Sequence, residues 1–66
     1  MSHKSNLVDV EVHLHFATGK AFKVSLSGDE DDAVWVPKSQ SLLDAQIDEV
    51  GTLSLPEWLA QERGLI

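Results

Sequence analysis

The stretch Leu7-Val-Asp-Val-Glu-Val-His-Leu-His-Phe16 alternates apolar and polar residues without a break. Successive side chains of a β-strand point to opposite faces, so strict alternation predicts a strand with one buried and one solvated face. The predicted inward set is Val8, Val10, Val12, Leu14 and Phe16. The predicted outward set is Asp9, Glu11, His13 and His15. One-sided strands of this kind are typical of antiparallel sheets.

Two further strands are predicted directly after this one. Residues 17–20 carry a glycine that favours a tight turn, and residues 21–26 alternate again. The apolar set of this second strand is Phe22, Val24 and Leu26. Residues 27–32 form a turn with four consecutive acidic residues, and residues 33–36 form a short apolar strand that Pro37 ends. These local signals predict a three-stranded meander.

Residues 41–50 are compatible with both helix and strand. Their apolar residues fall at helical spacing, yet the segment around Gly51 also suits a pair of strands. We expect a strand that ends near Ile47, a turn over residues 48–51 and a strand over residues 52–55. The complete expectation is then a small antiparallel sheet of three to five strands.

The C-terminal residues predict a short helix. Pro56 suits the first helical position, Glu57 faces the positive end of the helix dipole, and Gly64 is a natural stop. So short a helix is unstable alone and must pack onto the sheet. The side chains expected to pack it there are Trp58, Leu59 and Leu65. The predicted fold class is α+β, with this helix packed on the antiparallel sheet.

Length and composition limit the organisation of the chain. The 66 residues form one domain over 1–66, in which residues 1–6 are expected to be a flexible tail. The absence of cysteine excludes a disulfide and fits a reducing cytoplasm. No apolar run approaches the roughly 18 residues that span a bilayer. We therefore expect a cytoplasmic protein with no membrane partner.

The charge balance is the strongest compositional signal. Eleven Asp and Glu against five Lys and Arg give a net charge of −6. An acidic surface repels nucleic acid and anionic lipid, so we expect no direct nucleic-acid binding and favour a protein partner with a basic surface. A net charge of this size also keeps an ordinary small domain soluble, and that reading stays open.

No set of residues predicts catalysis. There is no cysteine or tyrosine, no nucleophile elbow and no phosphate-binding glycine-rich loop, so neither an enzyme nor a cofactor is expected. His13 and His15 could share a metal if other ligands joined them, although a solvated strand face with two imidazoles is the simpler reading. The acidic run at residues 29–32 lacks EF-hand spacing, so no metal site is predicted.

The candidate binding residues are acidic side chains and one tryptophan. Carboxylates held at intervals of several Å resemble the charge pattern of a nucleic-acid strand and could occupy a basic DNA-binding groove. The acidic candidates are Asp9, Glu11, Asp29, Glu30, Asp31 and Asp32. Trp35 lies between two valines on a predicted strand and is a candidate exposed anchor, whereas Trp58 is expected to be buried or half-buried.

Three motifs resemble a family of small phage and prophage proteins. The pattern TGKA matches residues 18–21, VWxPKSQ matches 34–40, and PEWLAxxKGL matches 56–65 with Arg63 in place of the usual lysine. The resemblance spans roughly residues 17–66 and implies a phage origin but no activity. The matching positions read as a turn, a strand with its proline stop, and a helix.

A very small acidic phage protein is also similar, at a coarse level, to anti-CRISPR proteins. This likeness implies an inhibitor that docks against a basic surface of a type I CRISPR surveillance complex in the bacterial cytoplasm and blocks target-DNA binding. The alternative is an accessory module of phage DNA replication or recombination that binds a protein through the sheet edge or Trp35. Either role is compatible with a monomer or a weak dimer.

Overall fold

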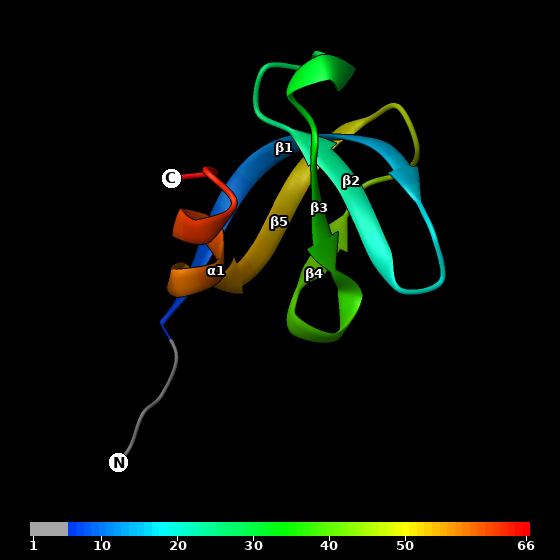
Figure 1. The fold of residues 1–66 in the computed structure, drawn as a ribbon. Helices are drawn as coiled ribbons and strands as arrows, with labels where there is room; N and C mark the ends of the chain where they lie inside the picture. The colour runs from blue at the N-terminus through cyan, green and yellow to red at the C-terminus, as the bar shows by residue number, and fades with distance from the viewer. Residues whose placement is uncertain (1–5) are drawn as a thin grey trace.

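The computed structural model describes residues 6–66 and shows a five-stranded antiparallel sheet with one short C-terminal helix packed on it (Figure 1). The predicted α+β class is confirmed. The expected flexible tail lies outside the described residues except for Asn6, whose carbonyl accepts a 2.8 Å hydrogen bond from the Glu57 N–H. The strands are β1 Leu7–Ala17, β2 Ala21–Ser25, β3 Val34–Pro37, β4 Leu42–Asp44 and β5 Val50–Pro56. The helix is α1 Glu57–Glu62, and the 3-10 turns are η1 Glu30–Asp32 and η2 Lys38–Gln40.

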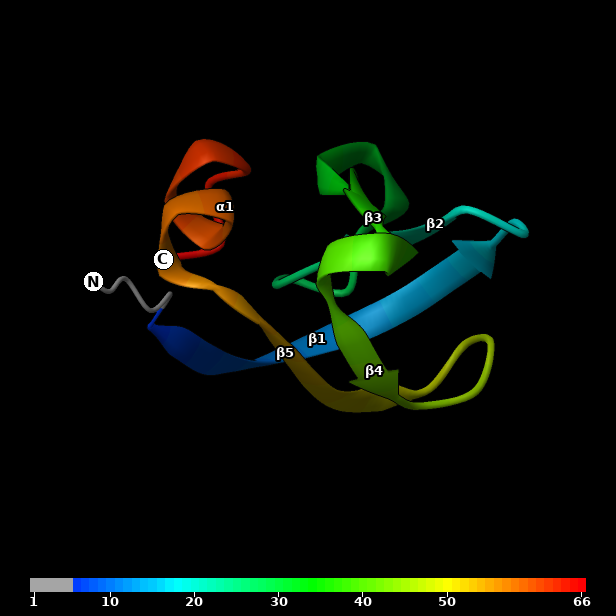
Figure 2. The same ribbon diagram turned by 90° about the horizontal axis from the view of Figure 1, so that it is seen from below.

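The long strand β1 is the centre of the sheet, whose order is β3-β2-β1-β5-β4. β1 pairs with β2 at its C-terminal half and with β5 along the rest, and every pair is antiparallel. Figure 2 shows that the sheet curls, so that β4, β5 and the first half of β1 lie apart from β2 and β3. The molecule therefore has two outer faces, one on each half of the sheet, with the core between them.

A bulge at His15 changes the direction of the side chains that follow it. The register of β1 against β2 runs from Leu14↔Val24 to Phe16↔Lys23, so one extra residue stands in β1. The predicted alternation holds from Val8 to Leu14. It is wrong for Phe16, which the bulge turns outward and leaves 53% exposed.

The hydrophobic core lies between the inner face of the sheet and the helix. Its buried residues are Val10, Val12, Leu14, Val24, Val36, Leu53, Leu55, Leu59, Ala60 and Leu65. Leu59 and Leu65 pack as predicted. Trp58 was expected to be buried or half-buried and is 52% exposed, because a helix turns by about 100° per residue and Leu59 and Ala60 occupy the inward side. Leu26, expected in the apolar set of the second strand, lies beyond β2, which ends at Ser25, and is also exposed.

Both ends of α1 lie close to the residues at which the sequence predicted them, with one correction at the first helical position. Pro56 was predicted at the first helical position and instead caps the helix with an extended backbone, ψ 144°, so that α1 begins at Glu57. At the other end, Gly64 adopts φ +75°. The Leu65 N–H then bonds the Ala60 carbonyl and the Gly64 N–H bonds the Gln61 carbonyl, the two bonds of a Schellman motif.

The ambiguous segment 41–50 forms a shorter strand than predicted. β4 ends at Asp44 and β5 begins at Val50, so the expected strand to Ile47 and turn over 48–51 are both displaced. The loop between them is held on β1 by backbone bonds from the Leu14 N–H to the Glu49 carbonyl and from the Asp48 N–H to the Leu14 carbonyl. These bonds replace strand pairing, and Ile47 is left 49% exposed.

Candidate functional site

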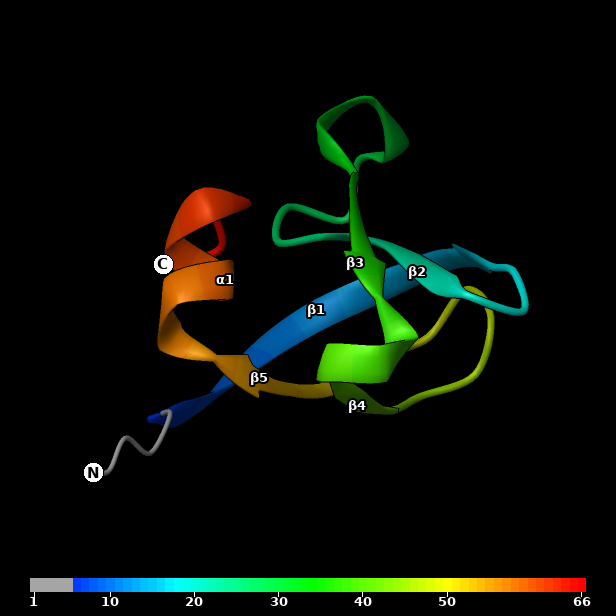
Figure 3. The same ribbon diagram turned by 60° about the horizontal axis from the view of Figure 1, so that its bottom comes forward.

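The candidate binding residues fall on the two different halves of the sheet. Asp9 and Glu11 lie on the first half of β1, beside β5, whereas Trp35 lies in β3. The acidic segment 29–32 forms η1 and its cap, directly before β3 (Figure 3). The structure therefore brings Trp35 and the acidic segment to one half and places Asp9 and Glu11 on the other, so they do not form a single site.

Asp9 and Glu11 belong to an acidic face that runs across three strands. Directly opposed residues of an antiparallel pair share a face, and Thr52 is opposed by Glu11 on one side and by Asp44 on the other. Asp44 therefore joins Asp9 and Glu11, and these three residues are the acidic face. Sequence reasoning missed Asp44 because its position depends on the pairing of β4 with β5. All three side chains are exposed.

Within residues 6–66, the carboxylates of the acidic face take part in no ion pair. β4, β5 and the first half of β1 contain no Lys or Arg. Residues two apart on a strand are separated by roughly 7 Å, and residues two strands apart by roughly 10 Å. Within the described residues, the polar contact of these carboxylates is a 2.6 Å hydrogen bond that the Ser54 hydroxyl donates to Asp9 Oδ1. This face is therefore a preorganised array of negative charge.

The acidic segment 29–32 uses most of its carboxylates for its own structure. Asp29 caps η1 by accepting a 3.0 Å bond from the Asp31 N–H. Glu30 accepts a 3.1 Å bond from Lys23 Nζ, and Asp32 accepts a 3.1 Å bond from the Ser27 hydroxyl. Among the described residues, the Asp31 carboxylate makes no such contact. The segment is thus less available to a basic partner than its composition suggests.

Trp35 is exposed, as the anchor residue of a binding surface has to be. Its side chain is 45% exposed, and Lys23 Nζ lies 5.9 Å from the ring centroid. Its carbonyl accepts a 2.8 Å hydrogen bond from Arg63 Nε, directly after α1. One carbonyl on the outer edge of β3 therefore already has a hydrogen-bond donor from the same chain.

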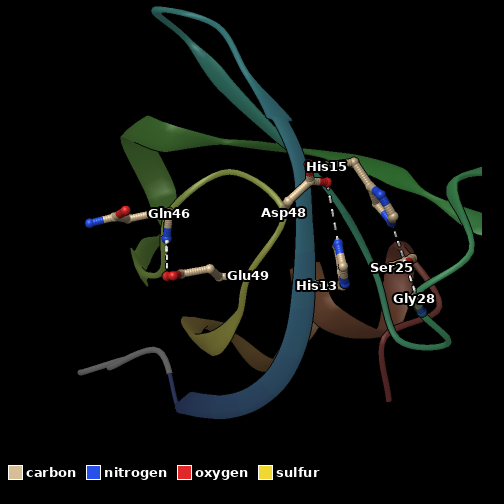
Figure 4. Close-up of polar contacts among 7 residues, drawn as sticks. All are labelled: His13, His15, Ser25, Gly28, Gln46, Asp48 and Glu49. Carbon is tan, nitrogen blue, oxygen red and sulfur yellow. Dashed lines mark hydrogen bonds and ion pairs between the residues drawn. The ribbon is translucent and has the colours of Figure 1, made fainter.

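The two histidines form a small polar cluster on β1 (Figure 4). Their rings stack with centroids 4.5 Å apart. His15 Nε2 lies 2.8 Å from the Ser25 hydroxyl, which also accepts a bond from the Gly28 N–H. His13 Nε2 lies 3.7 Å from Asp48 Oδ1. Each ring is thus occupied by a protein partner, in contrast with the freely solvated face that was expected.

The part of the chain that the structure describes holds little that indicates another kind of site. Among residues 6–66, no group of three or more histidine or acidic side chains is placed to hold a metal ion. No described helix is long and apolar enough to cross a membrane. Comparison of the chain with protein-family models, curated proteins and solved structures finds no match.

Proposed function

We propose that this chain is a binding protein without catalytic activity, which lays its acidic face on a basic, nucleic-acid-contacting surface of another protein. One observation carries the proposal: Asp9, Glu11 and Asp44 share a face on three adjacent strands that lack any Lys or Arg. The repulsion among these carboxylates is present in the free protein and is relieved when lysines or arginines of a partner come between them.

The binding is competitive with nucleic acid. A groove lined with Lys and Arg binds phosphates chiefly through charge, so a folded array of carboxylates can occupy the same positions. Exposed charges are screened beyond about 10 Å at 0.1 M salt, so the affinity falls as salt rises. No cofactor and no direct contact with nucleic acid are needed.

The particular target proposed is a type I CRISPR surveillance complex in the cytoplasm of a bacterial host. This choice rests on the resemblance of residues 18–21, 34–40 and 56–65 to phage and prophage proteins, together with the small size and net charge of −6. A phage protein that covers the DNA-binding groove of such a complex would block recognition of phage DNA. The chain would then act as an inhibitor of host defence.

The test is a phage plaque assay on hosts with and without an active type I CRISPR system, with the chain expressed from a plasmid. Restored plaquing only in the CRISPR-active host is the expected result. The variant Glu11→Gln/Asp44→Asn removes two charges from the acidic face and should abolish the effect.

A matched control variant changes the net charge of the chain by the same amount at another place. Glu57→Gln/Glu62→Gln removes two charges from α1 and should leave plaquing restored. Equal loss in both variants would show that total charge and not the acidic face matters. Unchanged plaquing with the wild-type chain in every type I subtype would refute the inhibitor and favour the accessory module of phage DNA replication or recombination.

A further inference from the structure

The first half of β1, residues 7–12, has a neighbouring strand on one side only. β5 pairs with all of it, whereas the ladder between β1 and β2 ends at His13↔Ser25. Figure 1 shows no strand beside residues 7–12 on the side away from β5. The cause is local, because the Ser25 hydroxyl accepts a 3.0 Å bond from the Gly28 N–H and Gly28 adopts φ +86°. The chain thus turns away from β1 directly after β2, and the central strand of the sheet has an open edge.

The main-chain groups on this open edge belong to Leu7, Asp9 and Glu11. Opposed residues of an antiparallel pair alternate between those that exchange hydrogen bonds and those that do not. The Glu57 N–H donates to the Asn6 carbonyl, so the even-numbered residues of this half of β1 are those that bond towards β5. The N–H and C=O groups of Leu7, Asp9 and Glu11 therefore point to the other side. Within residues 6–66, no main-chain hydrogen bond reaches them there.

The two outermost strands of the sheet offer less free main chain than β1. In β3, the Trp35 carbonyl accepts its bond from Arg63 Nε. The Pro37 carbonyl accepts a 2.8 Å bond from the Ser41 hydroxyl, and proline has no N–H to offer. β4 is only three residues long. Because an unpaired strand edge is a template for another strand, the first half of β1 is where this sheet can be extended.

The side chains beside the open edge indicate the chemistry of an added strand. Asp9 and Glu11 are exposed on the outer face, and β4, β5 and residues 7–12 contain no Lys or Arg. Opposite charges on directly opposed residues stabilise a strand pair. On the inner face, Val8 is only partly buried against the core, so an apolar neighbour would cover it further. A strand that alternates basic and apolar side chains therefore matches both faces of this edge.

We propose that the open edge of β1 binds an extended segment of the partner protein, in which Lys or Arg alternates with apolar residues, as an added strand. The inference deepens the proposed function and rests on it, because the acidic face selects the basic side chains. Main-chain bonds to Asp9 and Glu11 then add affinity that charge alone does not supply. A second copy of the chain is disfavoured here, since β1 against β1 would bring carboxylates of like charge together.

The first experiment is amide hydrogen exchange of the full chain, followed by NMR. The probe is a synthetic peptide of about eight residues, a common strand length, in which lysine and valine alternate. In the free chain, the Asp9 and Glu11 amides should exchange at least tenfold faster than the Val10 amide, which bonds to β5. Saturating peptide should slow exchange at Asp9 and Glu11 at least tenfold. Amides as protected as that of Val10 in the free chain, or unchanged by bound peptide, overturn the proposal.

A scrambled peptide separates an added strand from attraction by charge. This control has the same composition, with its lysines together at one end and its valines at the other. It should bind at least tenfold more weakly in titration calorimetry and protect neither amide. Equal affinity without protection would overturn the added strand and leave the charge-based proposed function standing. If neither peptide binds at low salt, the added strand is also overturned, and the plaque assay decides the proposed function by itself.

Two variants of one residue separate the main-chain contact from the carboxylate. Asp9→Asn removes the charge and keeps the N–H, whereas Asp9→Pro removes both. Proline is compatible with a strand edge whose N–H takes no part in a ladder, and circular dichroism verifies the fold of both variants. Asp9→Pro should bind the alternating peptide at least tenfold more weakly than Asp9→Asn. Equal affinity of the two folded variants refutes the main-chain contact, and the hydrogen-exchange result decides without them if Asp9→Pro does not fold.

Discussion

Gly51→Ala is expected to destabilise the fold strongly. The end of strand β4 passes so close to Gly51 of β5 that no side-chain atom fits between them. A Cβ at Gly51 would lie 2.1 Å from the Asp44 carbonyl oxygen and 2.5 Å from the Ala45 Cβ. A flexible side chain could rotate away from such a contact, but a strand carbonyl cannot. The β4–β5 pairing must therefore shift or separate.

The size of this effect follows from overpacking. Forced insertion of a methyl group into a tightly packed site costs typically 1–3 kcal/mol, and contact with backbone places Gly51→Ala at the upper end, about 3 kcal/mol. A chain of 66 residues has a total stability of roughly 3–10 kcal/mol, so much of it is lost. At about 4–8 °C per kcal/mol, the melting temperature should fall by about 12–24 °C.

The assay is thermal unfolding followed by circular dichroism, with Gly19→Ala as the matched control. A Cβ at Gly19 meets nothing within 4 Å, and its φ is not in the positive range. This control should unfold within about 4 °C of the wild type. A Gly51→Ala protein that also melts within about 4 °C of the wild type would refute the close approach of β4 to β5.

Three further substitutions test other contacts. Leu59→Ala removes a side chain that is 1% exposed and should cost about 2–5 kcal/mol in urea unfolding, whereas Trp58→Ala, at a site 52% exposed, should cost clearly less. Gly64→Ala places a Cβ at φ +75° and should cost about 1 kcal/mol in the same assay, with Gly64→Asn nearer to the wild type. Arg63→Ala frees the Trp35 carbonyl and should cost about 1 kcal/mol and raise aggregation measured by light scattering, while Arg63→Lys should recover part of both.

Much of the fold could be predicted from local patterns. Alternation placed the inner face of β1 correctly as far as Leu14, and Gly64 marked the end of α1. The prediction failed where a long-range contact decided the outcome. Phe16 points outward because of a bulge against β2, and the strand expected to reach Ile47 ends at Asp44 because the following loop bonds to β1.

The candidate site was harder to predict than the fold. All its acidic residues are exposed as expected, but sequence order cannot show that the sheet curls between Asp9 and the segment 29–32. Asp44 could be added to the acidic face only after its pairing with Thr52 was known. The partners that occupy Asp29, Glu30 and Asp32 likewise depend on side-chain geometry and not on composition.

The pairing of β1 with β5 also sets the order in which the molecule can assemble. The β1–β2 ladder closes at Ala17↔Phe22, whereas the β1–β5 ladder joins Leu7 to Pro56. Closing a long loop costs more entropy than closing a short one, so the hairpin can form early and β5 joins it late. Substitutions in the hairpin should slow refolding in stopped-flow experiments, whereas Leu53→Ala in β5 should chiefly accelerate unfolding. The lifetime of the folded molecule then depends most on the last strand to dock.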